Sequence, residues 1–135
     1  GNKAIVEADM YRVELISNPD SSFKVKSADY EFIIGLKGKS INPPDTLLAS
    51  LASCVGVYIR KYCEGSGIKL DNFNIIAEAE FGQEKPIGFR KINVSLDLKG
   101  AELDERRQKA LLEFIKNCPV HNTLKMNPAV DIKII

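Results

Sequence analysis

Three cysteines and the single histidine are the side chains of this sequence best suited to covalent or acid–base chemistry. Cys54 lies inside an uncharged stretch, Cys63 follows nine residues later, and Cys118 stands directly before a proline, with His121 three residues further on. An odd number of cysteines without a CxxC pair fits neither a secreted disulfide framework nor a structural zinc site. Free or redox-active thiols are therefore the chemistry that these residues indicate.

Cys54 is predicted to lie on a long helix. Asn42 is a suitable N-cap, Pro43 suits the first helical position, where a missing N–H costs nothing, and Asp45 faces the positive end of the helix dipole. The helix should run to about Glu64, because the sequence GSG that follows is a strong termination signal.

The first half of this helix is expected to be buried on every side. Thirteen consecutive residues, Thr46 to Tyr58, carry no formal charge in a chain where 27% of residues are charged. A helix of this kind needs other elements, or another subunit, to cover both of its faces. Burial in the middle of a helix normally leaves a thiol inert, so Cys54 would need a basic group and a second thiol nearby in order to react.

The two other cysteines differ in their expected surroundings. On a regular helix the nine residues from Cys54 to Cys63 correspond to about 13.5 Å of rise, too far for a disulfide, and Cys63 is expected to be an inert small residue. Cys118 falls at the N-cap of a short helix, where the dipole and the free N–H groups favour a thiolate. His121 could favour that thiolate further as an imidazolium, and its alternative role is that of a surface histidine in the first helical turn.

The whole chain, residues 1–135, predicts one α+β domain with the element order β-β-β-α-β-β-α-α-β. Apolar residues at every second position predict six strands, the first three as an antiparallel meander, and apolar stripes predict helices over 102–117 and 118–125. The alternating residues of the six strands are Tyr11, Val13 and Leu15; Phe23 and Val25; Tyr30, Phe32 and Ile34; Phe73, Ile75, Ala77, Ala79 and Phe81; Ile92, Val94, Leu96 and Leu98; and Val130, Ile132 and Ile134.

The composition argues against two classes of partner. With 19 basic and 18 acidic residues the net charge is +1, so neither nucleic acid nor an anionic membrane is expected as the main partner. The longest uncharged stretch is shorter than the roughly 18 apolar residues that a membrane span requires, and the N-terminal residues lack a signal layout. We therefore expect a soluble, cytoplasmic protein.

Three segments resemble, in their order and spacing, the OsmC/Ohr family of osmotically inducible and organic hydroperoxide resistance proteins. They are NPPDTLLASLASCVGVY at 42–58, PIGFRKINVSLDLKG at 86–100 and CPVHNTLK at 118–125. The most specific part is the pair of motifs, small-small-Cys in an uncharged helix and Cys-Pro-Val, whose cysteines lie 64 residues apart. The resemblance implies an OsmC-like fold in which antiparallel sheets pack around a central buried helix, in an intertwined homodimer with active sites at the subunit interface.

The resemblance also implies peroxiredoxin-like chemistry. A residue matching Cys54 attacks an organic hydroperoxide and becomes a sulfenic acid, and a residue matching Cys118 condenses with it to a disulfide that an external dithiol reduces. Neither a cofactor nor a metal is then required. In the family an arginine and an acidic residue hold the attacking cysteine as thiolate. Arg12 is the candidate arginine, with Arg90 behind it, and Asp45 is the nearest match to the acidic residue, offset by about one position.

The positions of these supporting candidates leave their roles open. Asp45 and Cys54 lie about 13.5 Å apart along one regular helix and on opposite faces, so only the other subunit's Asp45, or a relay through an arginine, could serve Cys54. Stabilisation of the helix N-terminus is an equally suitable role for Asp45, and Arg12 and Arg90 are also ordinary solvent-facing strand residues. These departures from the family pattern indicate a divergent OsmC-like member.

The main hypothesis is a thiol-dependent peroxidase that reduces organic hydroperoxides through a Cys54 sulfenic acid resolved by Cys118. The alternative is a non-catalytic small-molecule-binding or stress-response protein that retains the OsmC-like fold. A third hypothesis makes Cys118, with His121, the nucleophile of a transferase or hydrolase, and the sequence offers no oxyanion-hole glycine motif in its support.

Overall fold

The structure is a computed structural model that describes residues 10–36 and 38–135. The chain divides into two compact units, residues 1–46 and residues 47–135. The first unit carries a three-stranded sheet, and the second carries a two-stranded sheet, two short helices and most of one long helix. The predicted α+β class is confirmed, while the single domain over the whole chain stays a prediction.

The first unit is an antiparallel meander, as the alternating residues predict. β1 (Glu14–Ser17), β2 (Phe23–Ser27) and β3 (Tyr30–Ile34) lie in that order in one sheet. β1 is shorter than predicted and leaves Tyr11 and Val13 outside the sheet. The first residue of β1 pairs with a residue close to the end of β2. The residues before β1 therefore have almost no β2 backbone left with which to pair.

The long helix, α1 (Pro43–Ser66), ends two residues later than predicted. Gly67 has a φ of 67°, and the N–H of Ile68 donates to the carbonyl oxygen of Cys63 at 2.9 Å. This closure of a helix C-terminus requires a left-handed residue just after the last helical one. Gly67 supplies that conformation, so the helix continues through Gly65.

β4 (Asn74–Phe81) and β5 (Phe89–Asp97) form an antiparallel hairpin. The predicted alternation is confirmed, because every second residue is partly buried along most of both strands. Arg90 holds the connecting loop, since its guanidinium donates to the carbonyl oxygens of Glu84 at 2.8 Å and Pro86 at 2.7 Å.

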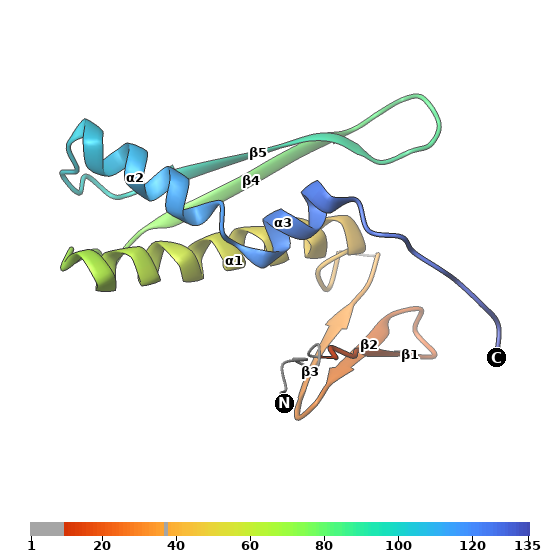
Figure 1. Cartoon of the computed structure of the whole chain (residues 1–135). Coiled ribbons are helices and arrows are strands. Elements are labelled where there is room, and N and C mark those ends of the chain that lie inside the picture. The colour runs from red at the N-terminus through yellow and green to blue at the C-terminus, as the bar shows by residue number, and fades with distance from the viewer. Residues whose placement is uncertain (1–9, 37) are drawn as a thin grey trace, which may run out of the picture. The chain divides into compact units, whose positions relative to one another are not determined.

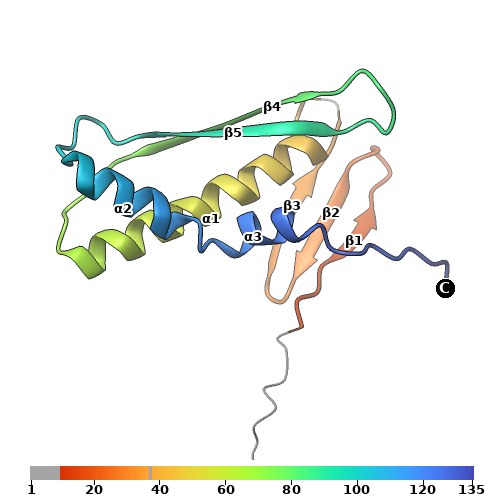
Figure 2. The same cartoon turned by 45° about the horizontal axis from the view of Figure 1, so that its top comes forward.

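Two short helices complete the second unit. α2 (Glu105–Ile115) begins after Asp104, whose carboxylate accepts the N–H of Arg107 at 2.8 Å, and α3 (Pro119–Met126) begins after Cys118. α2 lies over the C-terminal half of α1, α3 lies over its N-terminal half, and the β4–β5 hairpin runs alongside (Figure 1, Figure 2). None of the helices in the described part of the chain is long and apolar enough to span a membrane.

The core of the second unit is built on one stripe of α1. Four buried residues at a spacing of four form this stripe, and three others pack with them: Leu51, Val55, Ile59 and Cys63, together with Leu70, Leu111 and Cys118. Other apolar residues of the helix stay open, since Leu47 is 39% exposed and Val57 is 49% exposed. The prediction that the first half of the helix is buried on every side is therefore wrong for the single chain, in which one stripe faces the core.

The sixth strand predicted at the C-terminus is not formed in this structure. Residues 127–135 continue from α3 as extended chain (Figure 1), and Val130, Ile132 and Ile134 are 78%, 91% and 99% exposed. Alternation describes which side chains share a face, but a strand also needs a neighbouring backbone with which to pair. The segment pairs with no strand among the described residues, so its apolar face is left open.

Two glycines at the end of α1 test this account of the helix terminus. An added Cβ would meet nothing within 4 Å at either Gly65 or Gly67, so the positions differ chiefly in backbone conformation. Gly67→Ala should lower the free energy of unfolding by about 1 kcal/mol, because alanine is strained at positive φ. Gly65→Ala should raise it by about 0.5 kcal/mol, because this residue lies inside the helix. Urea unfolding at one protein concentration measures both changes, and equal effects would contradict the assignment of the cap.

Candidate active site

The N-terminus of α1 fixes the helix that carries Cys54. The side-chain oxygen of Asn42 accepts the N–H of Asp45 at 2.7 Å, and its carbonyl oxygen accepts the N–H of Thr46 at 2.9 Å. Pro43, at the first helical position, has no N–H that needs a partner. The predicted N-cap is confirmed, and Asp45 lies exposed in the first turn, where it faces the positive end of the helix dipole.

Cys54 lies at the edge of the buried stripe of α1. It precedes the buried Val55 by one residue, which on a helix turns its side chain about 100° away from that of Val55. The Cys54 side chain is partly buried and packs against the core of the second unit. It is therefore covered on one side and open on another.

Cys118 is held at the start of α3. It is the N-cap of this helix, as predicted, and its sulfur accepts the N–H of His121 at 3.4 Å. Its carbonyl oxygen accepts the N–H of Asn122 at 3.0 Å, and Pro119 occupies the first helical position. Since Cys118 is also 0% exposed, both its backbone and its sulfur are fixed in place.

The structure brings the side chains of Cys54 and Cys118 together in the core of the second unit, where Cys54 packs against the buried cluster that contains Cys118. Burial raises the pKa of the Cys118 thiol, and a hydrogen bond with the Cys54 side chain raises it further. Both thiols are free. A buried thiol at the start of one helix therefore lies beside a second thiol from another helix.

The helix N-terminus favours a thiolate at Cys118, as predicted, but burial has the larger effect and leaves the pKa raised. The N–H groups of His121 and Val120 do lower the pKa of this thiol, but burial outweighs them because the sulfur has lost its contact with water. Cys118 therefore keeps its proton to a higher pH than an ordinary thiol does.

Cys63 stands apart from this pair. It is buried in the core, it is free, and burial alone raises its pKa. A protonated thiol without contact to solvent is a poor nucleophile. Cys63 has the properties of the inert core residue that the sequence predicts.

The supporting candidates lie in different surroundings. Asp45 and Arg12 belong to the first unit and are exposed, and Arg12 precedes β1 instead of lying on the first strand as predicted. Arg90 belongs to the second unit, where it holds the hairpin loop through two carbonyl oxygens. Arg90 thus has a structural role, while the catalytic roles of Asp45 and Arg12 stay predictions.

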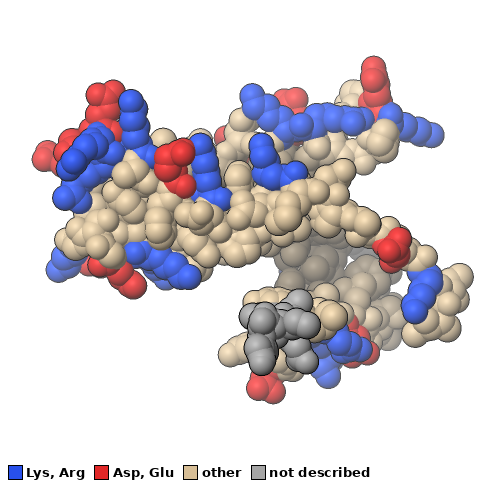
Figure 3. Space-filling model, in the orientation of Figure 1, with Lys and Arg blue, Asp and Glu red and all other residues tan. Residues whose placement is uncertain are grey.

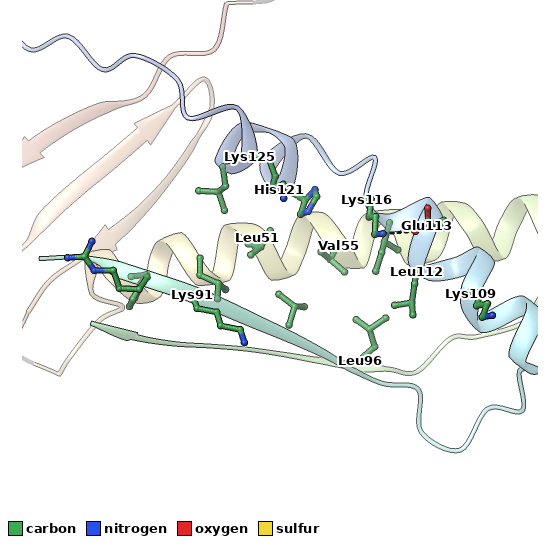
Figure 4. Close-up of a pocket in the computed structure, with 16 residues that line it drawn as sticks. Leu51, Val55, Lys91, Leu96, Lys109, Leu112, Glu113, Lys116, His121 and Lys125 are labelled. Carbon is green, nitrogen blue, oxygen red and sulfur yellow. Dashed lines mark hydrogen bonds and ion pairs between the residues drawn. The ribbon is translucent and has the colours of Figure 1, made fainter. Parts of the chain in front are cut away.

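His121 lies in the first turn of α3 and lines a cavity. Its Nδ1 is buried and has no hydrogen-bond partner among the described residues. The cavity has a volume of about 900 Å³, and Leu51 and Val55, which lie on either side of Cys54 in the sequence, also line it (Figure 4). The cavity therefore borders the thiol pair, although neither Cys54 nor Cys118 belongs to its wall.

The basic residues around this cavity are the part of the site that sequence reasoning missed. Lys91, Lys109 and Lys125 come from β5, α2 and α3, and all three line one cavity (Figure 4). Each taken alone has the pattern of a solvent-facing residue on its own element. Their common feature is spatial, and no spacing in the sequence marks it.

The fold and the site by themselves define a class of protein. It is an α+β protein that holds a pair of free thiols between a long helix and the N-terminus of a short one. No group of three or more histidine, cysteine, aspartate or glutamate side chains within residues 10–36 and 38–135 is placed to hold a metal ion. The chain belongs to the OsmC-like protein family, whose model matches residues 36–133.

Known relatives agree with this assignment. The chain is 28% identical over 123 residues to the hydroperoxide reductase of Mycoplasma genitalium, with 84% of this chain and 86% of that protein covered. The crystal structure of an OsmC-like protein from Mycoplasma pneumoniae has a TM-score of 0.75 at 22% identity and covers 88% of this chain and 89% of its own. The organic hydroperoxide resistance protein OsmC of Legionella pneumophila has a TM-score of 0.64 at 17% identity, with coverages of 90% and 93%. These two structures support the fold.

The raised pKa of Cys118 predicts a specific dependence of stability on pH. The folded state holds the Cys118 proton more tightly than the unfolded state, so stability should fall as the pH rises through the ordinary thiol value of 9.0. Cys118→Ser should lose less stability, because serine keeps an N-cap oxygen and does not titrate in this range. Urea unfolding of both proteins at pH 7.5, 8.5 and 9.5 under reducing conditions measures the difference.

The comparison is made in a Cys63→Ala background, which removes the other buried thiol with a raised pKa. Protein concentration is kept constant, because any association would also shift the apparent stability. Parallel pH profiles for the two proteins would show that Cys118 titrates equally in the folded and unfolded states.

Proposed function

We propose that this protein is a thiol-dependent peroxidase that reduces organic hydroperoxides, with Cys54 as the nucleophile and Cys118 as the resolving thiol. The observation that carries the proposal is that these two free side chains, which come from different helices, pack at the same buried cluster. Membership of the OsmC-like family and the hydroperoxide reductase name of the Mycoplasma genitalium relative support the class of substrate. The apolar core around Cys54 favours organic hydroperoxides over hydrogen peroxide.

The first half-reaction oxidises Cys54. Its thiolate attacks the terminal peroxide oxygen, an S–O bond forms and the O–O bond breaks. The electron pair of the O–O bond leaves on the alkoxide, which takes up a proton and departs as the alcohol. Cys54 is left as a sulfenic acid.

The second half-reaction closes and reopens a disulfide. The sulfur of Cys118 attacks the sulfur of Cys54, and the hydroxyl group leaves as water with the proton that Cys118 has kept. An external dithiol then supplies two electrons and two protons, which regenerates both thiols.

The active form in this proposal is a homodimer. Apolar side chains on α1, with Val57 49% exposed, and on the C-terminal segment, with Ile132 91% exposed, lack cover in the single chain. A second copy would cover such surfaces and supply Arg12 and Asp45 to the Cys54 of its neighbour. There the guanidinium would hold the thiolate and the peroxide, and the carboxylate would orient the guanidinium.

The rival function is a small-molecule-binding or stress-response protein that keeps the fold without the chemistry. The cavity of about 900 Å³ beside the thiols favours it, because its volume suits a small organic ligand. The two functions differ in the reactivity of Cys54, which alkylation measures directly.

Single cysteine substitutions separate these possibilities. Cys54→Ser should reduce the consumption of cumene hydroperoxide with dithiothreitol to the rate without protein, because the nucleophile is lost. Cys118→Ser should leave a Cys54 sulfenic acid that dimedone labels, because the resolving thiol is lost. Cys63→Ser is the matched control and should keep the activity, since Cys63 is outside the pair. Peroxide consumption and intact mass measure all three variants.

Two outcomes would count against the peroxidase. Turnover of cumene hydroperoxide by Cys54→Ser at the rate of the wild type would exclude Cys54 as the nucleophile. A wild-type protein whose Cys54 resists alkylation near neutral pH, and which forms no Cys54–Cys118 disulfide after peroxide treatment, would favour the binding protein.

Arg12 should contribute to catalysis from the neighbouring subunit. Arg12→Ala should lower kcat/KM for cumene hydroperoxide by about 10²-fold, the usual effect of losing one charged group that stabilises the transition state. Arg106→Ala, an exposed position on α2, makes the same change in net charge and should have little effect. A mixture of Arg12→Ala and Cys54→Ser proteins should recover part of the activity if the arginine acts across the interface, and no recovery would place it elsewhere.

A further inference from the structure

The imidazole of His121 contains a buried polar atom that the structure leaves unpaired. Within residues 10–36 and 38–135, its Nδ1 is the only buried side-chain nitrogen or oxygen without a hydrogen-bond partner. Leaving such an atom unpaired costs free energy, and a catalytic role is one reason for which a protein retains it. A neutral imidazole has one nitrogen that can accept a proton, and the chain has no other histidine.

His121 occupies the position of α3 whose side chain can turn back to the first residue of the helix. Cys118 is the N-cap, so His121 is the third residue of the helix, and its N–H donates to the Cys118 sulfur at 3.4 Å. In a capping box, the side chain at this third position accepts the backbone N–H of the N-cap residue. Here that N–H already donates to the carbonyl oxygen of Ile115 at 3.1 Å. The position therefore keeps an imidazole near Cys118 without engaging it in the cap.

The imidazole also faces the part of α1 that carries Cys54. It points from α3 toward α1, where Leu51 and Val55 lie, and these two residues line the same cavity as His121 (Figure 4). Cys54 lies between them in the sequence, within one helical turn of both. His121 is therefore tied to one thiol through its backbone and shares a cavity with the neighbours of the other.

The other charged groups around this cavity are poorly suited to accept a proton at neutral pH. They come from β5, α2 and α3 and comprise five cations and one carboxylate: Arg90, Lys91, Lys109, Glu113, Lys116 and Lys125. Basic side chains also form a row over the β4–β5 hairpin in Figure 3. Lysine and arginine are already protonated at this pH, and a carboxylate is a weak base. Glu113 also pairs with Lys116 at 2.6 Å. Among the described residues that line the cavity, the imidazole is the group best able to take up a proton.

The second half-reaction of the proposed peroxidase needs such a base. Burial raises the pKa of the Cys118 thiol, so this thiol keeps its proton at neutral pH. A cysteine attacks another sulfur as a thiolate, however, and a protonated thiol is a poor nucleophile. The proton of Cys118 must therefore be removed before or during its attack.

We propose that His121 is the base that takes the proton of Cys118 when this thiol attacks the Cys54 sulfenic acid. The electron pair of the S–H bond forms the S–S bond, and the S–O bond of the sulfenic acid breaks with its electron pair on the departing hydroxyl group. The imidazolium returns the proton to that group, which leaves as water. The step needs no further oxidant or reductant. It rests on the proposed peroxidase function and assigns its second half-reaction to a further residue.

A single turnover separates the two half-reactions. Reduced protein receives one equivalent of cumene hydroperoxide without dithiol, and intact mass after an acid quench measures the sulfenic acid and the disulfide, which differ by one water. His121→Asn keeps a polar side chain but has no group that takes up a proton at neutral pH. It should slow the conversion of sulfenic acid to disulfide by about 10²-fold, the usual effect of losing a general base. The sulfenic acid should therefore accumulate.

The pH profile and chemical rescue distinguish a base from a structural residue. In His121→Asn the conversion should accelerate by about tenfold per pH unit between pH 6.5 and 8.5, because the thiolate fraction of Cys118 then sets the rate. The wild-type rate should level off once the imidazole is neutral. Added imidazole should restore part of the rate in His121→Ala, because the cavity of about 900 Å³ has room for it.

Thr123→Ala is the matched control. It removes a hydroxyl group that donates to the carbonyl oxygen of Pro119 at 2.8 Å, at an exposed position of α3, and should leave both half-reactions unchanged. An equal loss in this variant, or a loss in His121→Asn with the pH profile of the wild type, would show that His121 only supports the helix.

The two proposals fail in different ways. A His121→Asn protein that converts its sulfenic acid at the wild-type rate at every pH would overturn the role of His121 and leave the peroxidase intact. A wild-type protein that forms no sulfenic acid would overturn the peroxidase, and the role of His121 with it.

Discussion

The second unit depends on one stripe of apolar side chains along α1. Leu51, Val55, Ile59 and Cys63 repeat every four residues, so they lie on nearly the same side of the helix, and Ile59 is 0% exposed. Loss of a fully buried isoleucine typically costs about 2–5 kcal/mol, a large part of the stability of a domain of this size. Cys54 precedes one of these residues, so its position beside the core follows from the helix period.

The second thiol is positioned by a different device. Cys118 is the N-cap of α3, and its sulfur accepts the N–H of His121 at 3.4 Å. One residue therefore satisfies the backbone at the start of a helix and presents a thiol to Cys54. A disulfide between the two would engage the same sulfur, so the start of α3 and the oxidation state of the pair are physically linked. Residues of α3 also line the cavity, so a change at the start of α3 would also affect the wall of the cavity.

Local signals predicted the features whose causes are local. The N-cap at Asn42 and the N-cap at Cys118 follow from residue types within one turn of the chain, and both are present. The meander and the hairpin follow from alternation within each strand, and they are also present. The interaction of Cys54 with Cys118 joins residues 64 apart in the sequence, and only the family resemblance pointed to it.

The features that the sequence did not predict correctly depend on the three-dimensional arrangement of the chain. Lys91 has the sequence pattern of an outward-facing strand residue, and a bulge, which alternation does not encode, places it at the cavity. Burial outweighs the helix N–H groups at Cys118 because α1 and the core close over the sulfur, and the residues next to Cys118 contain no sign of this. The end of α1 was misplaced by two residues because GSG offers two glycines, and only the backbone conformation shows which one ends the helix.

The uncharged run of α1 is longer than the core of a single chain requires. One residue per turn is buried, yet thirteen consecutive residues carry no charge, and Leu47 and Val57 stay 39% and 49% exposed. Covering what is still exposed of these two side chains contributes a fraction of the about 1.5–3 kcal/mol of full burial, so they favour association. The C-terminal segment adds an apolar face and an unpaired backbone in the same compact unit. In the proposed homodimer, a second copy of the chain would cover the helix and pair with the segment together.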